Sequence, residues 1–293
     1  MKFITKLILT AALLLTAYVP INADMISVYE ENDVLHNQDY YYSNGTKISY
    51  LNSALGWEFS LGQNMYTPEN KWTKAPPPGD RPYAGWLYLG AGKAWAQGAL
   101  EHYLEFNLGM IGPASYAYET QKCIHTLLNH QHVPEGWDSQ VGNELSGTVL
   151  FQESMSLVDS PYFNIIPKAS LCVGNLQDFA GLGTMVEAGY NVEQTLHNQI
   201  SIKTIQPPKY RAFLFAGAEG RYICHNSFLG GGMFHAYDYE VDMEHWVADL
   251  EYGLCLQYKA VKIYFTTDWR TREFATEDST FKPFDSIKLS VSF

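Results

Sequence analysis

Positive charge is scarce in this chain of 293 residues, which has 19 lysines and arginines against 31 aspartates and glutamates. Two of the basic residues, Lys2 and Lys6, lie in an N-terminal segment that we expect to be removed, so the mature chain is more acidic still. Proteins that bind nucleic acid neutralise its phosphates with lysine and arginine. The charge balance therefore excludes a nucleic-acid partner, and it is compatible with divalent cations.

Cysteine is scarce as well, and the four that occur follow no metal-binding spacing. They are Cys123, Cys172, Cys224 and Cys255. An exported chain is able to form disulfides, and four cysteines allow three pairings. We expect them to be free, or one pair to form at most.

Long apolar runs are absent after the first 23 residues. Lys2 and Lys6 precede an apolar run over 7–19, and small and polar residues follow at 20–23. This pattern is typical of a secretory signal peptide, here with cleavage after Ala23, and the run is too short to span a bilayer as a helix. We therefore expect residues 1–23 to be a signal peptide and residues 24–293 to form one exported all-β domain.

Alternation of apolar and polar residues, with a period of two, runs through the mature chain. In 246–258, apolar side chains occupy the even positions from Trp246 to Tyr258, while Asp249 and Glu251 stand between them. This period is typical of strands. Twelve such segments are predicted, at 25–33, 43–51, 57–67, 82–95, 101–112, 146–157, 162–174, 179–192, 208–222, 246–258, 261–270 and 287–293.

A soluble sandwich and a transmembrane barrel share this alternation, and three features favour the barrel. The segments are about ten residues long, which suits a tilted strand that crosses a bilayer. Aromatic residues stand at strand ends, as an interfacial belt requires. Charges also lie in mid-strand, which a packed sandwich core does not tolerate unpaired; they are Glu101, Glu105, Glu187, Asp249 and Glu251. We therefore predict an all-β fold, a 12-stranded antiparallel transmembrane β-barrel.

One long insert, residues 113–145, breaks the alternation. Ser115 is a plausible capping hydroxyl, the helical pattern runs from Tyr116 to about Gln131, and Pro134 and Gly136 end it. Loops of this length are usually functional or disordered, and the apolar content argues against disorder. The insert places His125 beside an apolar helix face.

Strand parity sorts the connections into two groups. With the N-terminus on the periplasmic side, the turns at 52–56, 96–100, 158–161 and 259–260 are periplasmic, and the loops at 34–42, 68–81, 113–145 and 272–283 are extracellular. The stretch 193–207 fits poorly, because it makes a long periplasmic connection. Polar clusters at 31–33, 43–45 and 79–86 then meet the helical insert at the extracellular end, which predicts an active site at the outer leaflet.

Several of these segments resemble the outer-membrane lipid A 3′-O-deacylases of the LpxR type. The matching pieces are ENDVL at 31–35, YYSNGTK at 41–47, GDRPYAGWLYLG at 79–90, MIGP at 110–113, QKCIH at 121–125 and GWDSQVGNE at 136–144. They cover the N-terminal half of the mature chain in order. The resemblance implies a barrel whose site lies between its wall and the helical insert, and calcium-assisted hydrolysis of the acyl ester at the 3′ position of lipid A.

By position, the resemblance implies roles for individual residues. His125 matches the catalytic histidine, Asn32 and Asp33 match a site pair, and Ser43 stands where the family has a hydroxyl residue. A family glutamate six residues after the histidine is replaced here by Gln131, with Glu135 a little further on.

The chemistry of these residue types is consistent with that implication. An imidazole such as that of His125 titrates near neutrality and can act as a general base. Asp33 offers the oxygen ligands that Ca²⁺ prefers, and zinc at His125, His130 and His132 has the wrong spacing for one helix face. Arg81, Lys71 and Lys74 are candidates to bind lipid A phosphates, and Gln121 is a further candidate for substrate binding.

Two other function classes stay open. An outer-membrane phospholipase would use Ser43 as a nucleophile paired with a histidine, but no Gly-x-Ser-x-Gly elbow surrounds Ser43. A structural or pore-forming barrel would have no use for the helical insert and the polar rim. The expected partners are lipopolysaccharide, through its lipid A, and the lipid of the outer membrane, and a monomer is expected.

Overall fold

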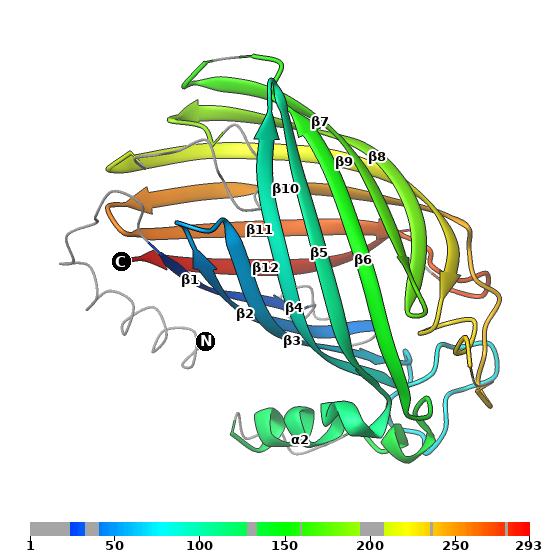
Figure 1. Ribbon diagram of the computed structural model, residues 1–293. Coiled ribbons are helices and arrows are strands. Elements are labelled where there is room, and N and C mark those ends of the chain that lie inside the picture. The colour runs from blue at the N-terminus through cyan, green and yellow to red at the C-terminus, as the bar shows by residue number, and fades with distance from the viewer. Residues whose placement is uncertain are drawn as a thin grey trace.

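The computed structural model describes residues 24–32, 41–127, 134–158, 160–193, 208–234, 237–278 and 281–293. The predicted signal peptide, Asp33, Gln131 and nearly all of 193–207 lie outside these ranges. Within them the chain forms a closed antiparallel barrel, in which every strand pairs with its neighbours in sequence and β1 pairs with β12 (Figure 1). This confirms the predicted fold class.

Most of the predicted strand segments are close to the observed strands. The strands are β1 (Met25–Asn32), β2 (Tyr41–Asn52), β3 (Trp57–Thr67), β4 (Ala84–Gln97), β5 (Leu100–Ile111), β6 (Glu144–Met155), β7 (Phe163–Gly174), β8 (Gln177–Tyr190), β9 (Tyr210–Asn226), β10 (Trp246–Tyr258), β11 (Val261–Thr271) and β12 (Phe281–Ser292). Two boundaries differ from the prediction by more than two residues. β9 runs on to Asn226, and β12 begins at Phe281 rather than 287, because Pro283 and the polar residues beside it hide the alternation.

The alternation has a direct structural meaning. In β10, Leu250 and Leu256 on the outer face are 46% and 48% exposed and Leu254 is half-buried, whereas Cys255, between Leu254 and Leu256, is fully buried. Successive side chains of a strand point to opposite faces. Apolar residues therefore cover the outside of the barrel, and the polar positions face the lumen. All four cysteines are free.

Ion pairs fill the lumen at the mid-strand charges that favoured a barrel. Lys47 of β2 contacts Glu105 of β5 at 2.7 Å, and Lys168 of β7 contacts Glu219 of β9 at 3.1 Å. Asp249 of β10 lies between Arg221 and Arg270. A buried charge is tolerated where an opposite charge pairs with it, so these pairs explain how the lumen accommodates its acidic residues.

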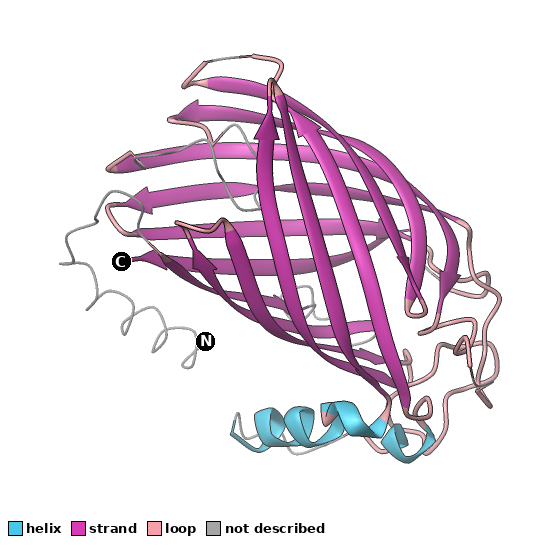
Figure 2. Ribbon diagram, viewed as in Figure 1, coloured by secondary structure: helices cyan, strands magenta, loops and turns pink. Residues whose placement is uncertain are grey.

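The connections gather at two ends of the barrel (Figures 1 and 2). We call the end that holds the chain terminus Phe293 the turn end; its turns include 53–56, 98–99 and 259–260, and β8 ends and β9 begins there. The opposite end, the loop end, carries 68–83, 112–143, 227–245 and 272–280. This grouping matches the prediction, except that the loop over 227–245 was not assigned, because its residues follow neither period.

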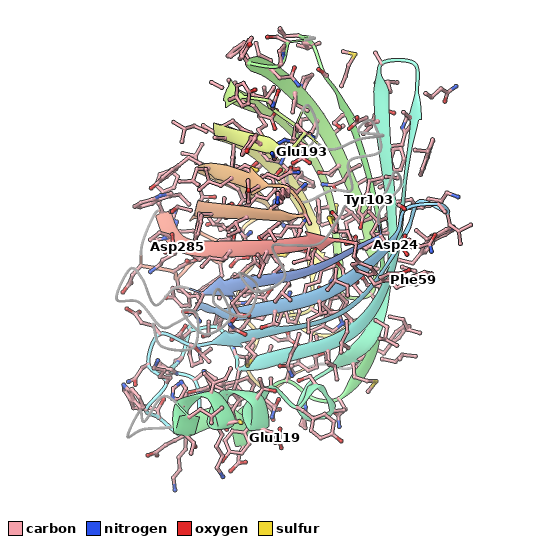
Figure 3. The ribbon with its side chains drawn as sticks, turned by 90° about the vertical axis from the view of Figure 1, so that its left-hand side faces the viewer. Asp24, Phe59, Tyr103, Glu119, Glu193 and Asp285 are labelled. Atoms are coloured by element: carbon pink, nitrogen blue, oxygen red, sulfur yellow. The ribbon has the colours of Figure 1, made fainter. Side chains whose placement is uncertain are left out.

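The helical insert stands outside the ring of strands at the loop end. Helix α2 (Ala117–Leu127) is flanked by the 3-10 turns η2 (Pro113–Ser115) and η3 (Gly136–Ser139). Glu119 marks α2 beside the barrel in Figure 3. The predicted capping role of Ser115 is wrong, because its hydroxyl donates to the carbonyl of Gly112 at 2.6 Å and Tyr116 has a positive φ of 56° before α2 begins. Among the described residues, no helix is long and apolar enough to cross a membrane.

Candidate functional site on the outer wall at the loop end

Near its C-terminal end, β1 carries two polar side chains on the outer face of the barrel. Ser27 and Glu31 face the lumen, where the Ser27 hydroxyl bonds that of Ser290 at 2.8 Å. By the parity of the strand, Glu30 and Asn32 point outward, on the same face as Ile26. A carboxylate on the lipid-facing side of a barrel is costly. These two residues therefore need an explanation that the fold does not supply.

Glu30 is held by donors from β2. Its carboxylate accepts hydrogen bonds from the Thr46 hydroxyl at 2.6 Å and from the Asn44 amide, and the same amide also reaches the carbonyl of Glu31 at 3.1 Å. Thr46 and Asn44 lie opposite Glu30 and Asn32 in the antiparallel register. Hydrogen bonds to an ionised carboxylate are the strong ones. The outer wall thus carries a fixed, oriented carboxylate near the loop end.

Asn32 continues this polar cluster toward β3. Its amide donates to the carbonyl of Ser43 at 2.9 Å, and the Ser43 hydroxyl shares a 2.6 Å hydrogen bond with that of Thr67. A β-bulge between Tyr42 and Asn44 inserts Ser43 as an extra residue, and bulges often re-aim a side chain next to an active site. We name Glu30, Asn32, Ser43, Asn44, Thr46 and Thr67 the outer-wall cluster.

Helix α2 is anchored to β3 and β4, next to this cluster. Gly85 has no side chain, and an added Cβ would lie 2.3 Å from Cβ of Ala117, so only glycine lets the insert approach so closely. Gln63 of β3 donates to the carbonyl of Ser115 at 2.6 Å. Met65 packs in a buried cluster with Ala117, and its other members are Tyr83 and Trp137. The insert is therefore fixed against the outside of the wall rather than over the lumen.

His125 and Gln121 lie one helical turn apart on α2. Gln121 is 5% exposed, and its Oε1 accepts a 2.7 Å hydrogen bond from the indole N–H of Trp137. His125 is half-buried in the last turn of the described helix. Gln121 thus ties α2 to η3, which orients the helix face that carries His125, and its predicted contact with substrate stays a prediction.

The predicted phosphate-binding lysines lie in the loop over 68–83. The backbone carbonyl of Lys71 accepts a hydrogen bond from the Tyr83 hydroxyl at 2.9 Å, and Lys71 is buried. Lys74 is exposed, and its carbonyl accepts from Ser139 of η3 at 2.7 Å. Glu135 donates its backbone N–H to the carbonyl of Lys71 at 3.2 Å. These contacts bind the loop to the helical insert and leave the side chain of Lys74 in solvent.

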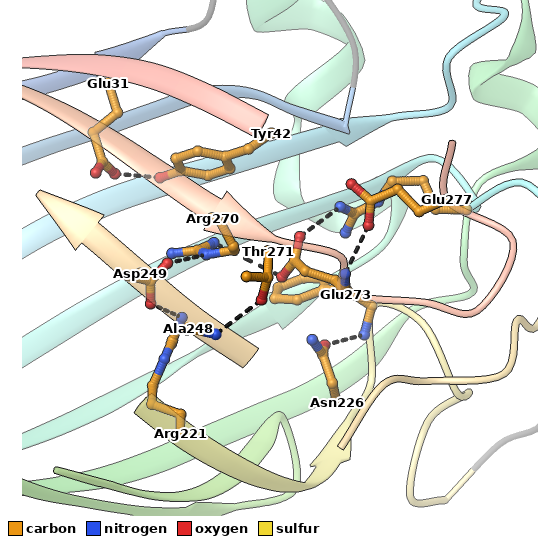
Figure 4. A network of polar contacts seen from close by, with 12 residues as sticks. Glu31, Tyr42, Arg221, Asn226, Ala248, Asp249, Arg270, Thr271, Glu273 and Glu277 are labelled. Atoms are coloured by element: carbon orange, nitrogen blue, oxygen red, sulfur yellow. Dashed lines mark hydrogen bonds and ion pairs between the residues drawn. The ribbon is translucent and has the colours of Figure 1, made fainter. Parts of the chain in front are cut away.

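Arg81 lies elsewhere: it contacts Glu273, which belongs to the polar network at the lumen mouth (Figure 4). Its side chain is fully buried, with the guanidinium 4.3 Å from the ring centre of Tyr66 and Nη1 3.4 Å from Oε2 of Glu273. Glu273 in turn donates its N–H to Glu277 at 2.7 Å. Burial, and next the charge of Glu273, raises the pKa of Glu277 to about 7. Contact of Arg81 with a phosphate stays a prediction that requires this network to open.

The outer-wall cluster offers oxygen atoms to a cation. Its carboxylate and three hydroxyls are hard oxygen donors of the kind that Ca²⁺ takes, whereas zinc prefers nitrogen and sulfur. In the described part of the chain, no group of three or more His, Cys, Asp or Glu side chains is placed to hold a metal. Calcium at this cluster, with Asp33, the next residue after Asn32, as a further carboxylate, stays a prediction that rests on the type of these oxygen donors.

Sequence reasoning overlooked Glu30, Thr46 and Thr67, and it gave Asn44, within the cluster 43–45, no role of its own. The motifs drew attention to 31–33 and 43–45 as rim clusters without asking which face each residue occupies. Counting by two from Ile26 places Glu30 and Asn32 together among lipid-facing positions. The period of two was therefore the sequence signal that could have placed Glu30 and Asn32 on the outer face.

The comparisons with known proteins agree with this architecture. LpxR from Salmonella typhimurium superposes with a TM-score of 0.80 and 21% sequence identity, over 92% of this chain and all of that one, which shows the fold. The β domain of the Bordetella autotransporter BrkA (TM-score 0.45, 11% identity, 94% of this chain and 100% of that one covered) and the KdgM porin (TM-score 0.42, 10% identity, 92% and 99% covered) are more distant.

A search of the curated proteins found no match. The profile of the family described as outer membrane protein LpxR, by contrast, matches residues 3–293, which is nearly the whole sequence. The chain therefore belongs to the LpxR family of outer membrane proteins.

Proposed function

We propose that this protein is a lipid A 3′-O-deacylase that hydrolyses the ester-linked acyl chain at the 3′ position of lipid A in lipopolysaccharide. One observation carries the proposal: a cluster of carboxylate, amide and hydroxyl groups lies on the lipid-facing wall, next to the strands on which the His125 helix is anchored. Polar groups at membrane depth are costly and usually functional. A site on the outside of the wall suits a substrate that is itself part of the membrane.

The reaction requires water, a base and stabilisation of the developing oxyanion. In our proposal His125 takes a proton from water as the oxygen attacks the ester carbonyl, and it returns the proton to the departing 3′ oxygen, so that a free fatty acid and a 3′ hydroxyl result. A calcium ion held by Asp33 and neighbouring oxygens would supply Lewis acidity at the ester carbonyl. Asn32 orients the Ser43 backbone that forms the edge of the site.

The proposed orientation places the loop end outside the cell. Barrels of the outer membrane have short periplasmic turns and longer extracellular loops. Here the long loops 68–83, 112–143, 227–245 and 272–280 lie at the loop end, which also has the two-residue turn 175–176, and the turns 53–56, 98–99 and 259–260 lie at the turn end with the C-terminus. The outer-wall cluster then lies at the level of the outer leaflet, where lipopolysaccharide resides. The N-terminal signal peptide is part of the same proposal.

A phospholipase with Ser43 as nucleophile is less well supported. Among the described residues the Ser43 hydroxyl bonds Thr67, and Ser43 is only 3% exposed. An activated serine needs a base within hydrogen-bond reach. We therefore assign Ser43 a positioning role.

Mass spectrometry of lipid A tests the proposal. Lipid A from cells that express the protein should lose the mass of the 3′ acyl group, and lipid A from cells that express the His125→Gln variant at equal outer-membrane level should not. The function would be ruled out if the wild-type protein leaves lipid A unchanged in two settings: in cells, and when purified protein and substrate are mixed with calcium in detergent. Loss of acyl chains from phospholipids instead would favour the phospholipase.

A further inference from the structure

The outer wall has a hollow of about 570 Å³, within the roughly 300–1,000 Å³ that ligand pockets occupy. It crosses five neighbouring strands, from β3 to β7. The outward-facing residues that line it are almost all apolar: Phe59, Leu89, Ala91, Phe106, Leu108, Gly147, Val149 and Val173. The two polar lining residues, Asn107 and Thr148, occupy lumen-facing positions and contact each other at 3.4 Å.

The strand register explains the shape of the hollow. Phe59, Ala91, Phe106, Val149 and Val173 form one row of directly opposed residues, and Leu89, Leu108 and Gly147 form the next row. Each row contains one small residue among large ones. Ala91 and Gly147 form the floor, and the neighbouring aromatic and branched side chains rise on either side.

The hollow is continuous with the wall on which the helical insert is anchored. Gly85, under Ala117, is four residues from Leu89 along β4, and Met65, which packs against the insert, is six residues from Phe59 along β3. At about 3.3 Å per residue, the near edge of the hollow is roughly 13 Å from Gly85. An acyl chain whose ester lies near Gly85 would therefore reach the hollow with its distal part only.

We propose that the hollow holds the hydrocarbon tail of the acyl chain whose ester is cleaved. This inference rests on the proposed function and names the part of the substrate that the wall recognises. The lining has no charged group, and the face is turned to lipid, so that the occupant has to be a hydrocarbon. Continuity with β3 and β4 favours the scissile chain over any other lipid.

The contribution of the hollow is to position the chain rather than to attract it. A chain that leaves the bilayer for the wall exchanges one apolar environment for another, so the hydrophobic effect adds little, and packing against the wall decides where the chain lies. Misplacing a reacting group by about 1 Å can cost on the order of a hundredfold in rate. The hollow therefore predicts selectivity for chain length.

The test fills the hollow and compares the variant with a matched glycine on the far wall. A Cβ at Gly147 would lie 3.4 Å from the nearest atom, the carbonyl of Asn107, so Gly147→Leu fits without backbone strain. Gly220 of β9 also faces outward, and no atom lies within 4 Å of its added Cβ, so Gly220→Leu is the control. Ala91→Leu is a second filling variant.

Purified lipid A with a short or a long 3′ chain serves as substrate, and barrel folding is checked by heat-modifiable gel migration. Gly147→Leu and Ala91→Leu should cleave the long chain about ten- to a hundredfold more slowly and the short chain at nearly the wild-type rate, while Gly220→Leu resembles wild type on both. Equal long-to-short ratios in the filled variants and the wild type would overturn the inference while leaving the proposed function intact. Failure of the wild type on both substrates would instead overturn the proposed function and, with it, this inference.

Discussion

Polar groups inside the barrel and polar groups on its outer wall have different origins. Inside, Lys47 contacts Glu105, and Asp249 lies between two arginines, so both of these acids have basic partners. On the outer wall, Glu30 has neutral donors, Thr46 and the Asn44 amide, as its hydrogen-bond partners. A paired lumen is how a barrel of this size tolerates its interior charges.

The outer-wall cluster has no comparable structural reason. Apolar side chains at Glu30 and Asn32 would suit a lipid-facing strand better, because intramembrane polar groups are expensive. The interior network is therefore explained by the fold, and the exterior one by chemistry. Substitutions in the outer-wall cluster should lower activity more than stability, and substitutions in the lumen should lower stability more than activity.

The largest expected effect is that of calcium. Chelation should abolish lipid A hydrolysis and added calcium should restore it, because the Lewis acid is proposed to polarise the ester. Asp33→Asn should require a higher calcium concentration for half-maximal activity, which a calcium titration of the acyl-release rate measures. Full activity of the wild type in excess chelator would remove calcium from the mechanism.

The second-largest loss of activity is expected when His125 is replaced. Replacing His125 by glutamine removes the general base, for which losses of about 10²–10⁴-fold are typical, while the barrel should still show heat-modifiable migration on gels. The measured quantity is the initial rate of fatty acid release. Near-wild-type turnover of His125→Gln would contradict the assignment.

Ser43→Ala is the matched comparison for His125→Gln. It removes one hydrogen bond to Thr67, worth about 0.5–1.5 kcal/mol, so the rate should fall by at most roughly two- to thirteenfold. No acyl group should be trapped on the protein when the reaction is quenched. An acyl adduct on Ser43, seen by intact-protein mass spectrometry, would support the phospholipase alternative.

Glu30→Gln against Glu105→Gln tests the comparison between outer wall and lumen directly. Glu30→Gln removes the charge of the outer-wall cluster but keeps an oxygen that accepts hydrogen bonds from Asn44 and Thr46, so the rate should fall while the urea midpoint changes little. Glu105→Gln leaves Lys47 without its partner, so it should lower the unfolding midpoint and leave the rate per folded molecule unchanged. The opposite pattern would reverse the roles assigned to the two regions.

Much of the fold follows from the sequence because a barrel imposes a strict period of two. The alternation located twelve strands, and the charges in mid-strand correctly indicated a polar lumen. Prediction from alternation failed where the period of two is interrupted, at Pro283 in β12 and in the loop over 227–245. It also failed at Ser115, whose hydroxyl was read as a helix cap but bonds the preceding turn.

The candidate site was harder to derive because its parts come from separate strands. Motifs indicated Asn32, Ser43 and His125, but they did not show that Thr67 of β3 is the partner of Ser43, which depends on the bulge at Tyr42. Arg81 was grouped with the site from its motif. The structure instead packs its guanidinium against Tyr66 and Glu273, because tertiary pairing across 192 residues is invisible to local pattern.

The smallest effect on activity is expected from Glu277, in the loop over 272–278. Its pKa is raised to about 7, first by burial and then by the charge of Glu273, from an ordinary value of 4.5. The folded protein therefore binds this proton more tightly than the unfolded chain does. The stability it contributes is complete below about pH 4.5, declines as the pH rises, and is lost above about pH 7.

This loop should consequently be cut faster by an added protease at pH 8 than at pH 5, once the rates are corrected for the pH dependence of the protease on a denatured substrate. Glu277→Gln should abolish the difference, because an amide does not titrate, and Glu273→Gln should move its midpoint to lower pH by removing the neighbouring charge. The ratio of the lipid A hydrolysis rates of Glu277→Gln and wild type should stay near one across the same interval, because the network at the lumen mouth is separate from the outer-wall cluster. A ratio that changes with pH would couple the two regions and contradict their separation.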